Sequence, residues 1–237
     1  MVRHRDVRID GVRLSCAEWG EPDGPTVVLL HALGLSGDDW EGTAQRLAPD
    51  HRVLAPDMRG HRRSDWPGAY SFESMRNDVL GLGEALDLDH VTLVGHSMGG
   101  VVAWLVAQRR PTWLSRLVIE DVPVPSAGVP VPLGSRPDGT LRFDWAVIAA
   151  IVAQLNAPDP AWWQGLSRIE VPTVVLRGGP TSHVPQDKIL ACAAAVSGAE
   201  VVDIPVGHHI HRNAPDEFLA AWSAPWRPSA GRYSTER

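Results

Sequence analysis

The sequence predicts an α/β protein: a mostly parallel central sheet with helices on both faces. Uninterrupted strand-length runs such as Thr26–Leu30 and Thr173–Arg177 alternate along the chain with segments whose apolar residues recur at helical spacing. At 237 residues, the chain has the size of one α/β domain with a small insertion.

The order of the predicted elements begins with a hairpin. Val7–Ile9 and Val12–Trp19 alternate apolar and polar residues around Asp10-Gly11, which predicts two antiparallel edge strands. Ser71 precedes Phe72–Leu86, whose apolar spacing predicts a capped helix. The other predicted elements are strands at Arg52–Ala55, Leu117–Ile119 and Glu200–Ile204 and helices at Met98–Arg109, Phe143–Leu155, Pro185–Val196 and Pro215–Trp222.

One segment interrupts this alternation. Val122–Pro137 mixes proline with small and apolar residues and fits neither helix nor strand. It follows a predicted strand at the edge of the sheet where a lid would attach. We therefore predict a core formed by 1–122 and 166–225, a small cap at 123–165 and a flexible tail at 226–237.

The composition restricts the classes of partner. A formal net charge of −6 does not favour binding to nucleic acid or to an anionic membrane surface. No apolar run reaches the length of a membrane span, and the charged N-terminus is unlike a secretory signal. Cys16 and Cys192 are too few for a disulfide framework, so we expect reduced thiols and a cytoplasmic protein. The sequence does not indicate the oligomeric state.

The main chemical motif lies at Gly95-His96-Ser97-Met98-Gly99. An apolar, β-branched strand precedes it and an apolar helix-forming segment follows, as a nucleophile elbow requires. The sharp turn needs small residues two before and two after the serine, which Gly95 and Gly99 provide. The pattern favours Ser97 as a nucleophile over an ordinary serine in a glycine-rich turn.

Four motifs together resemble the α/β-hydrolase family over nearly the whole chain outside the cap. They are His31-Ala32-Leu33-Gly34, Asp57-Met58-Arg59-Gly60-His61, the elbow around Ser97, and Gly207-His208 followed by Pro215-Asp216-Glu217-Phe218. The resemblance implies a catalytic triad in the chain order serine, acid, histidine. In such a triad, an imidazole accepts the serine proton and a carboxylate orients and charge-balances the imidazole.

The histidine is chosen from Gly207-His208-His209-Ile210-His211. His208 matches the family's Gly-His position, and His209 and His211 are its competitors. Clustered histidines also raise the question of a metal, but the sequence places no carboxylate or thiolate at ligand spacing beside them. We expect no metal site.

The acid is absent from the loop where many relatives carry it. Gly178–Pro185 holds no carboxylate, and the first one after it is Asp187. Some relatives take the acid from the end of the preceding strand, where this chain has Glu120 and Asp121. Asp121 matches the relatives' aspartate and shares its direction along the strand with Ile119, so it is preferred to Glu120.

The resemblance also implies an oxyanion hole formed by the backbone N–H groups of Met98 and Leu33. Each such donor lowers the barrier by roughly 3 kcal/mol. Two departures from the family lie nearby: Ala32 follows His31 where relatives have glycine, and Arg62 occupies the place of a second glycine. Asp57 and Arg59 are interpreted as a structural ion pair.

Four residues are candidates for contact with substrate: His31, His96, Trp145 and Trp162. The tryptophans, with Trp163, Leu133 and Phe143, either form an apolar roof over the pocket or only pack the cap on the core. Both interpretations predict that these apolar side chains are buried.

The sequence therefore predicts a serine hydrolase that acts through an acyl-enzyme on a small ester or similar acyl compound with an apolar part. No metal or organic cofactor is implied. Hydrolysis of carbon–carbon bonds, amides or lactones, perhydrolysis and acyl transfer use the same triad and stay open. A non-catalytic ligand-binding protein is the alternative from another class, since the usual loop lacks the acid.

Overall fold

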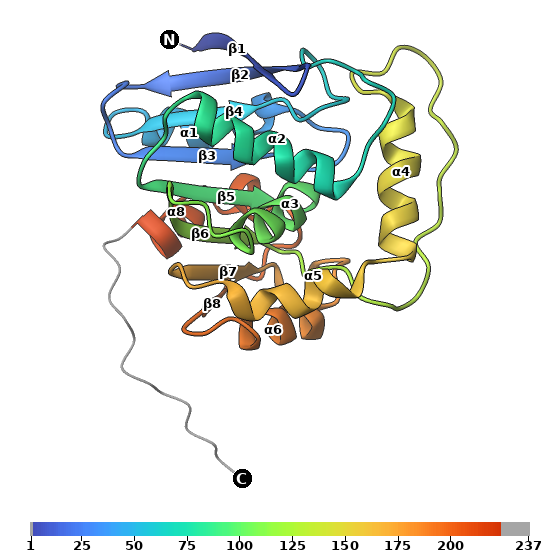
Figure 1. Ribbon diagram of the computed structural model, residues 1–237. Helices are drawn as coiled ribbons and strands as arrows, with labels where there is room; N and C mark the ends of the chain where they lie inside the picture. Colours follow the sequence, from blue (N-terminus) through green and yellow to red (C-terminus); the bar gives the residue numbers. More distant parts are fainter. Residues whose placement is uncertain (1, 224–237) are drawn as a thin grey trace.

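The structure is a computed structural model that describes residues 2–223, so the predicted tail at 226–237 lies outside the described residues. Within the described range, eight strands form one sheet in the order β1-β2-β4-β3-β5-β6-β7-β8 (Figure 1). β2 pairs antiparallel with β1 and β4, and the remaining neighbours are parallel. The predicted fold class is confirmed.

The bounds of the elements follow the predicted order. The strands are β1 Arg3–Ile9, β2 Val12–Gly20, β3 Thr26–Leu30, β4 Arg52–Pro56, β5 Val91–His96, β6 Leu114–Glu120, β7 Thr173–Arg177 and β8 Glu200–Asp203. The α-helices are α1 Glu41–Leu47, α2 Phe72–Ala85, α3 Met98–Ala107, α4 Trp145–Asn156, α5 Pro160–Gln164, α6 Gln186–Ala194, α7 Ile210–Asn213 and α8 Pro215–Ser223. Short 3₁₀ turns are η1 Gly37–Trp40, η2 Gly165–Arg168 and η3 Gly179–Thr181.

Local signals set two of these elements. Asp10 and Gly11 connect β1 to β2 with φ of 46° and 84°, the left-handed conformation that a two-residue hairpin turn needs. Ser71 caps α2: its hydroxyl accepts from the Ser74 N–H, and the Ser74 hydroxyl accepts from the Ser71 N–H. This reciprocal pair satisfies two helix N-terminal donors.

Helices cover the sheet on both faces, and each face has its own apolar core. One core includes Met75 of α2 and Trp104 of α3, which are fully buried. The other includes Trp40 and Phe218 of α8. Successive strand residues point to opposite faces, so the parallel strands β3 and β5, which helices cover on both faces, are predominantly apolar.

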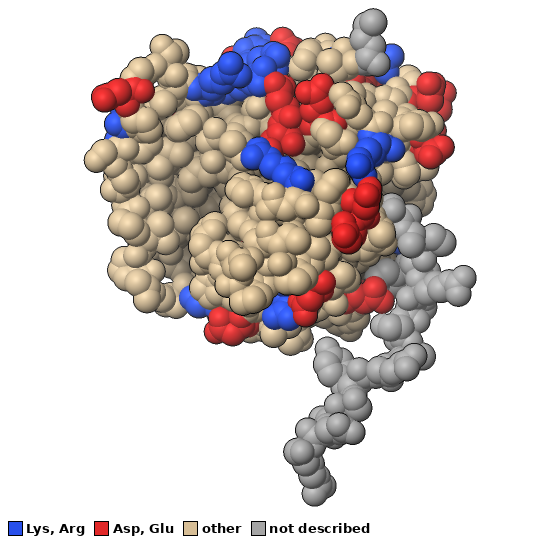
Figure 2. All heavy atoms as spheres, turned by 180° about the vertical axis from the view of Figure 1, so that it is seen from behind, with Lys and Arg blue, Asp and Glu red and all other residues tan. Residues whose placement is uncertain are grey.

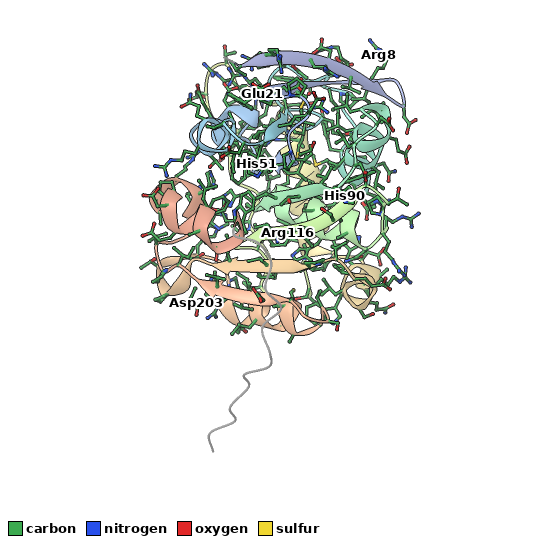
Figure 3. The ribbon with its side chains drawn as sticks, turned by 90° about the vertical axis from the view of Figure 1, so that its left-hand side faces the viewer. Arg8, Glu21, His51, His90, Arg116 and Asp203 are labelled. Atoms are coloured by element: carbon green, nitrogen blue, oxygen red, sulfur yellow. The ribbon has the colours of Figure 1, made fainter. Side chains whose placement is uncertain are left out.

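The strands β3, β5, β6 and β7 run parallel and therefore end at the same edge of the sheet. The elbow lies at this edge, since Ser97 follows β5 directly. Figure 3 shows the opposite edge, where His51 and His90 precede β4 and β5.

The segment predicted as a cap carries α4 and α5, beside the end of the sheet where β5 terminates (Figure 1). His61 and Phe143 form an isolated antiparallel bridge that attaches the start of α4 to the loop after β4. Val147 and Ile151 of α4 are buried against the core of the α2/α3 face. Seen from behind, the molecular surface is hollowed on the side where this segment lies (Figure 2).

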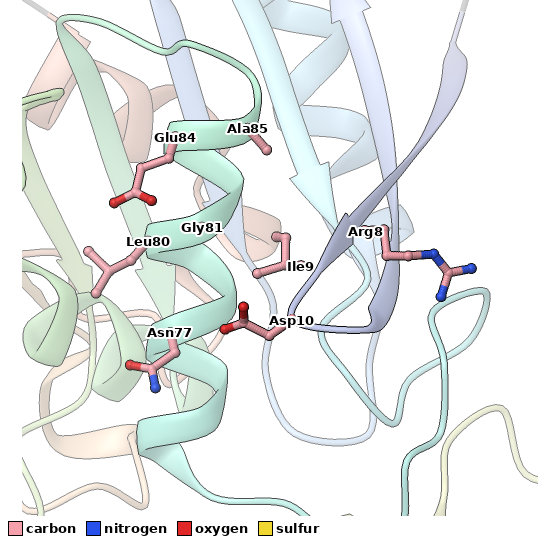
Figure 4. Close-up of a pocket in the computed structure, with 8 residues that line it drawn as sticks. All are labelled: Arg8, Ile9, Asp10, Asn77, Leu80, Gly81, Glu84 and Ala85. Carbon is pink, nitrogen blue, oxygen red and sulfur yellow. The ribbon is translucent and has the colours of Figure 1, made fainter.

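A pocket of about 520 Å³ lies between the β1–β2 hairpin and α2 (Figure 4). Ile9 and Asp10 face the helix residues Leu80 and Gly81 across it, and Arg8 points away from the helix. The strands β4 and β3 lie between this hairpin and β5 in the sheet, so the pocket is remote from the elbow. It does not belong to the predicted site.

None of the helices between residues 2 and 223 combines the length and the hydropathy that a membrane crossing needs.

Replacing Gly99 by alanine is expected to destabilise the fold. A Cβ at Gly99 would lie 2.3 Å from the Leu30 carbonyl oxygen, which is backbone and does not rotate away. We expect Gly99→Ala to lower the free energy of unfolding by about 2–4 kcal/mol in urea denaturation. Gly42→Ala in α1 is the control, because a Cβ added at Gly42 would have no other atom within 4 Å. A Gly99→Ala protein as stable as the Gly42→Ala protein would contradict this account.

Candidate active site

Ser97 occupies a strained turn between β5 and α3. Its φ of 52° and ψ of −120° lie outside the regions that non-glycine residues normally adopt. The turn closes tightly, because a Cβ on Gly95 would lie 2.4 Å from the Gly99 carbonyl oxygen. Ser97 remains partly exposed at the helix start. The backbone thus has the geometry of a nucleophile elbow.

The structure brings His208 and Asp121 together. His208 Nδ1 lies 2.9 Å from Asp121 Oδ2, at the carboxyl end of β6. The rings of His96 and His183 flank the His208 ring, with centroids 4.5 and 4.4 Å away. Since His96 precedes Ser97 in the chain, the His208 imidazole lies beside the elbow. Among residues 2–223, the Ser97 hydroxyl forms no hydrogen bond, so the second contact of the predicted triad, between Ser97 and His208, is not made.

Asp121 is buried and accepts hydrogen bonds from the loop after β7. The Gly178 N–H donates to it at 2.7 Å, the Gln186 amide at 2.9 Å, and the Ser182 hydroxyl also donates. Burial raises the pKa of Asp121, but the hydrogen bonds from His208 and these three donors together lower it below its ordinary value. Asp121 is therefore a carboxylate at neutral pH.

The donors to Asp121 are site residues that the sequence analysis missed. Gly178 and Ser182 lie in the loop that carries the acid in many relatives, and Gln186 follows it as the first residue of α6. The absence of a carboxylate in that loop was the only sequence signal. His183, exposed in the same loop, was missed as well. No periodic pattern marks a loop residue that donates to an acid from another strand.

Glu120 holds a different histidine of the same loop as His208. It is fully buried, and its carboxylate lies 2.9 and 2.8 Å from His211 Nδ1. It also accepts from the His211 N–H at 2.9 Å. Burial raises the pKa of Glu120, but His96 and His211 lower it below its ordinary value overall. Consecutive carboxylates at the end of β6 thus fix both His208 and the loop that carries it.

Three buried groups near the site have the chemistry of metal ligands. Ligand atoms of His96, Glu120 and His211 lie within 4.8 Å of one another. The sequence argument considered only carboxylates near these histidines along the chain. In the structure a carboxylate does lie beside them, because the fold brings in Glu120 from β6. Contacts with His211 already satisfy Glu120, whereas neither ring nitrogen of His96 has a hydrogen-bond partner among the described residues. The absence of a metal stays a prediction.

Two backbone N–H groups are available as donors to an oxyanion, one at the start of α3 and one in the loop after β3. As the first residue of α3, Met98 has an N–H without an intrahelical partner. Within residues 2–223, the Leu33 N–H is also without a partner. The adjacent Gly34 N–H donates to His61 Nε2 at 3.1 Å, and the Phe143 ring lies against Gly34. Burial lowers the pKa of His61 to about 3, so the ring is neutral and can accept this hydrogen bond.

His31 and His96, which the sequence suggested as substrate-binding residues, both lie inside the protein, and their contact with substrate stays a prediction. Both are fully buried. His31 Nε2 accepts from the Met58 N–H at 2.9 Å, and its Nδ1 lies 2.8 Å from the Ala32 carbonyl oxygen. His31 therefore links the loop after β3 to the loop after β4. His96 lies behind the elbow among the other histidines, and burial lowers its pKa to about 3.

The expected ion pair between Asp57 and Arg59 also needs correction. Arg59 pairs with Asp78 on α2 through two hydrogen bonds at 2.5 Å and does not pair with Asp57. Asp57 instead accepts from the Gly37 and Arg63 N–H groups. The sequence placed the two residues side by side in one motif, but it did not show which helix faces Arg59.

The two tryptophans differ in position. Trp162 is 4% exposed, its Nε1 donates to Glu73 at 2.9 Å, and its ring packs edge-on against Phe72 of α2. It packs the predicted cap on the core, and its proposed contact with substrate stays a prediction. Trp145 is partly exposed at the start of α4. Its role in binding stays a prediction.

Comparison with known proteins identifies the family. A model of the alpha/beta hydrolase fold matches residues 25–144. The chain belongs to the α/β-hydrolase family.

Two relatives of this α/β hydrolase each match about half of the chain. It is 34% identical over 131 residues to the AB hydrolase superfamily protein YfhM of Bacillus subtilis, covering 52% of this chain and 45% of that protein. It is 38% identical over 133 residues to a non-heme chloroperoxidase of Streptomyces lividans, covering 55% of this chain and 47% of that protein. The matches thus span about half the length of these relatives.

One solved structure shows the same fold over almost the whole chain. A hydrolase from Pseudomonas aeruginosa superimposes with a TM-score of 0.80 at 24% identity, covering 92% of this chain and 96% of that chain.

Acid is expected to destabilise the protein through its buried neutral histidines. Burial lowers the pKa of His31 from 6.5 to about 4 and that of His61 to about 3. Below pH 6.5 the unfolded chain binds protons that the folded chain does not, so stability falls as pH falls towards these values. In urea denaturation between pH 7 and 5, His31→Gln should show a shallower pH slope than the parent, by up to about 1.4 kcal/mol per pH unit.

His90→Gln is the control, because the His90 side chain is 86% exposed. It should keep the slope of the parent. A His31→Gln protein with the slope of the parent would rule out His31 as a source of the acid sensitivity.

Proposed function

We propose that this α/β hydrolase is a serine hydrolase that forms an acyl-enzyme with an ester or related acyl substrate that has an apolar part. One observation carries the proposal: the 2.9 Å contact between His208 Nδ1 and a buried carboxylate, beside the strained Ser97 turn. A hydrogen bond from Nδ1–H to Asp121 leaves the Nε2 lone pair available as a base.

In the first half of the reaction, Ser97 Oγ attacks the substrate carbonyl carbon and His208 Nε2 takes the hydroxyl proton. The Met98 and Leu33 N–H groups stabilise the oxyanion of the tetrahedral intermediate. Collapse of this intermediate breaks the bond to the leaving alcohol, which receives the proton from His208. Ser97 is then acylated.

In the second half, water attacks the acyl carbon and gives its proton to His208. Collapse releases the carboxylic acid and returns the proton to Ser97 Oγ. Asp121 favours the imidazolium in both halves because its carboxylate accepts the Nδ1–H bond. Desolvation is the main cause that lowers the pKa of the neighbouring His96 and of His183. Near neutral pH these two rings therefore add no positive charge that would oppose the His208 imidazolium.

Labelling with a fluorophosphonate probe tests the nucleophile. We expect the parent to be labelled and Ser97→Ala to remain unlabelled, because the probe reacts only with an activated hydroxyl. Ser167→Ala, which removes an exposed serine on η2, should be labelled like the parent. Equal labelling of the parent and Ser97→Ala would refute Ser97 as the nucleophile.

Turnover of short- and medium-chain p-nitrophenyl esters tests the acid. Asp121→Asn should lower kcat by about 10³-fold or more, because an amide does not balance the imidazolium charge. Asp187→Asn should remain within about twofold of the parent, because Asp187 is exposed on α6. Similar small losses in both variants would show that the acid is assigned wrongly.

A further inference from the structure

A second pocket, of about 340 Å³, lies beside the loop after β3. Three arginines line it: Arg62 from the loop after β4, Arg142 ahead of α4, and Arg212 from α7. Its volume suits a small ligand or part of one.

The charges in this pocket leave one guanidinium in excess. Arg62 pairs with Asp38, and Arg212 pairs with Asp39. Arg142 is exposed and forms no ion pair within the described part of the chain. The two aspartates thus hold two of the guanidinium groups in place, while the third is free to bind an anion.

Arg62 adopts a backbone conformation that would suit glycine better. Its φ is 42°, in the left-handed region, and the family resemblance places a glycine at this position. The Arg62 N–H donates to the Arg142 carbonyl oxygen at 2.6 Å, so the two residues are adjacent. The arginine carries the cost of this conformation and supplies a guanidinium that glycine would lack.

The pocket adjoins both loops that complete the predicted site. Its lining residue Gly34 follows Leu33, the predicted oxyanion donor. Arg212 lies four residues after His208 in the histidine loop. A ligand group held here therefore lies against the loop after β3 and the histidine loop, the two loops that the proposed reaction uses.

We propose that this arginine pocket, defined by Arg62, Arg142 and Arg212, binds the carboxylate of an anionic acyl substrate, such as the half-ester of a small dicarboxylic acid. The proposal rests on the proposed hydrolase function, because it names the substrate class of the same site. Planar guanidinium groups bind carboxylates through paired hydrogen bonds, which favours this class over neutral esters.

Two substrates of equal carbon count test the proposal: mono-p-nitrophenyl glutarate, which carries a terminal carboxylate, and neutral p-nitrophenyl pentanoate. The readout is the ratio of their kcat/KM values, anionic over neutral, so that a general loss of activity cancels. The parent should favour the glutarate ester. Arg142→Gln should lower the ratio on the order of tenfold, as expected for loss of a charge-assisted hydrogen bond.

Arg168→Gln is the matched control, because Arg168 is an exposed arginine on η2 outside the pocket, and it should keep the ratio of the parent. Arg62→Gly restores the residue typical of relatives and should lower the ratio as Arg142→Gln does. If both variants hydrolyse both esters with the same kcat/KM ratio as the parent, the proposal is overturned.

Calorimetric titration with glutarate separates the two proposals, because it needs no turnover. We expect glutarate to bind the parent and to bind Arg142→Gln about tenfold more weakly. If neither ester is hydrolysed but this difference in binding is found, the proposed function fails and the anion pocket stands. Equal glutarate affinity in the parent and Arg142→Gln would overturn the pocket.

Discussion

The site depends on a single buried carboxylate at the end of β6. Desolvation raises the pKa of Asp121, and the hydrogen-bond donors that surround the carboxylate lower that pKa below its ordinary value. Those donors come from the loop after β7 and from the histidine loop, at residues 178, 182, 186 and 208. One charge therefore organises two loops that are remote from each other in the sequence. An amide in its place would leave these donors without a charged acceptor.

This arrangement exchanges the roles of two neighbouring loops. In many proteins that this chain resembles, the loop after β7 carries the acid. β6 and β7 are adjacent parallel strands, with Glu120 paired to Leu176 in register, so their ends lie at the same place on the sheet edge. A carboxylate from either strand end can reach the histidine. In this chain the proposed acid, Asp121, comes from the end of β6, and the loop after β7 supplies hydrogen-bond donors to it.

The sequence predicted the features that depend on neighbours along the chain. Strand runs, the Asp10-Gly11 turn, the Ser71 cap and the elbow are all local patterns, and the structure has them. The choice of Asp121 relied on strand alternation, which holds only for extended backbone. Asp121 itself has a φ of 49°, so the chain has already left the extended conformation there. Features that depend on pairing between distant elements were not predictable: the partner of Arg59, the burial of His31 and the packing of Trp162 on α2.

Contacts connect the arginine pocket to His208, the proposed base, through one short loop. Arg212 pairs with Asp39, and the preceding residue, His211, is fixed to Glu120. Glu120 adjoins Asp121, which holds His208. The position of Arg212 and the position of the His208 ring therefore both depend on the end of β6, Arg212 through the neighbouring His211 and His208 through Asp121. A substrate anion bound beside Arg212 would therefore be placed relative to the base by the contacts that orient the base itself.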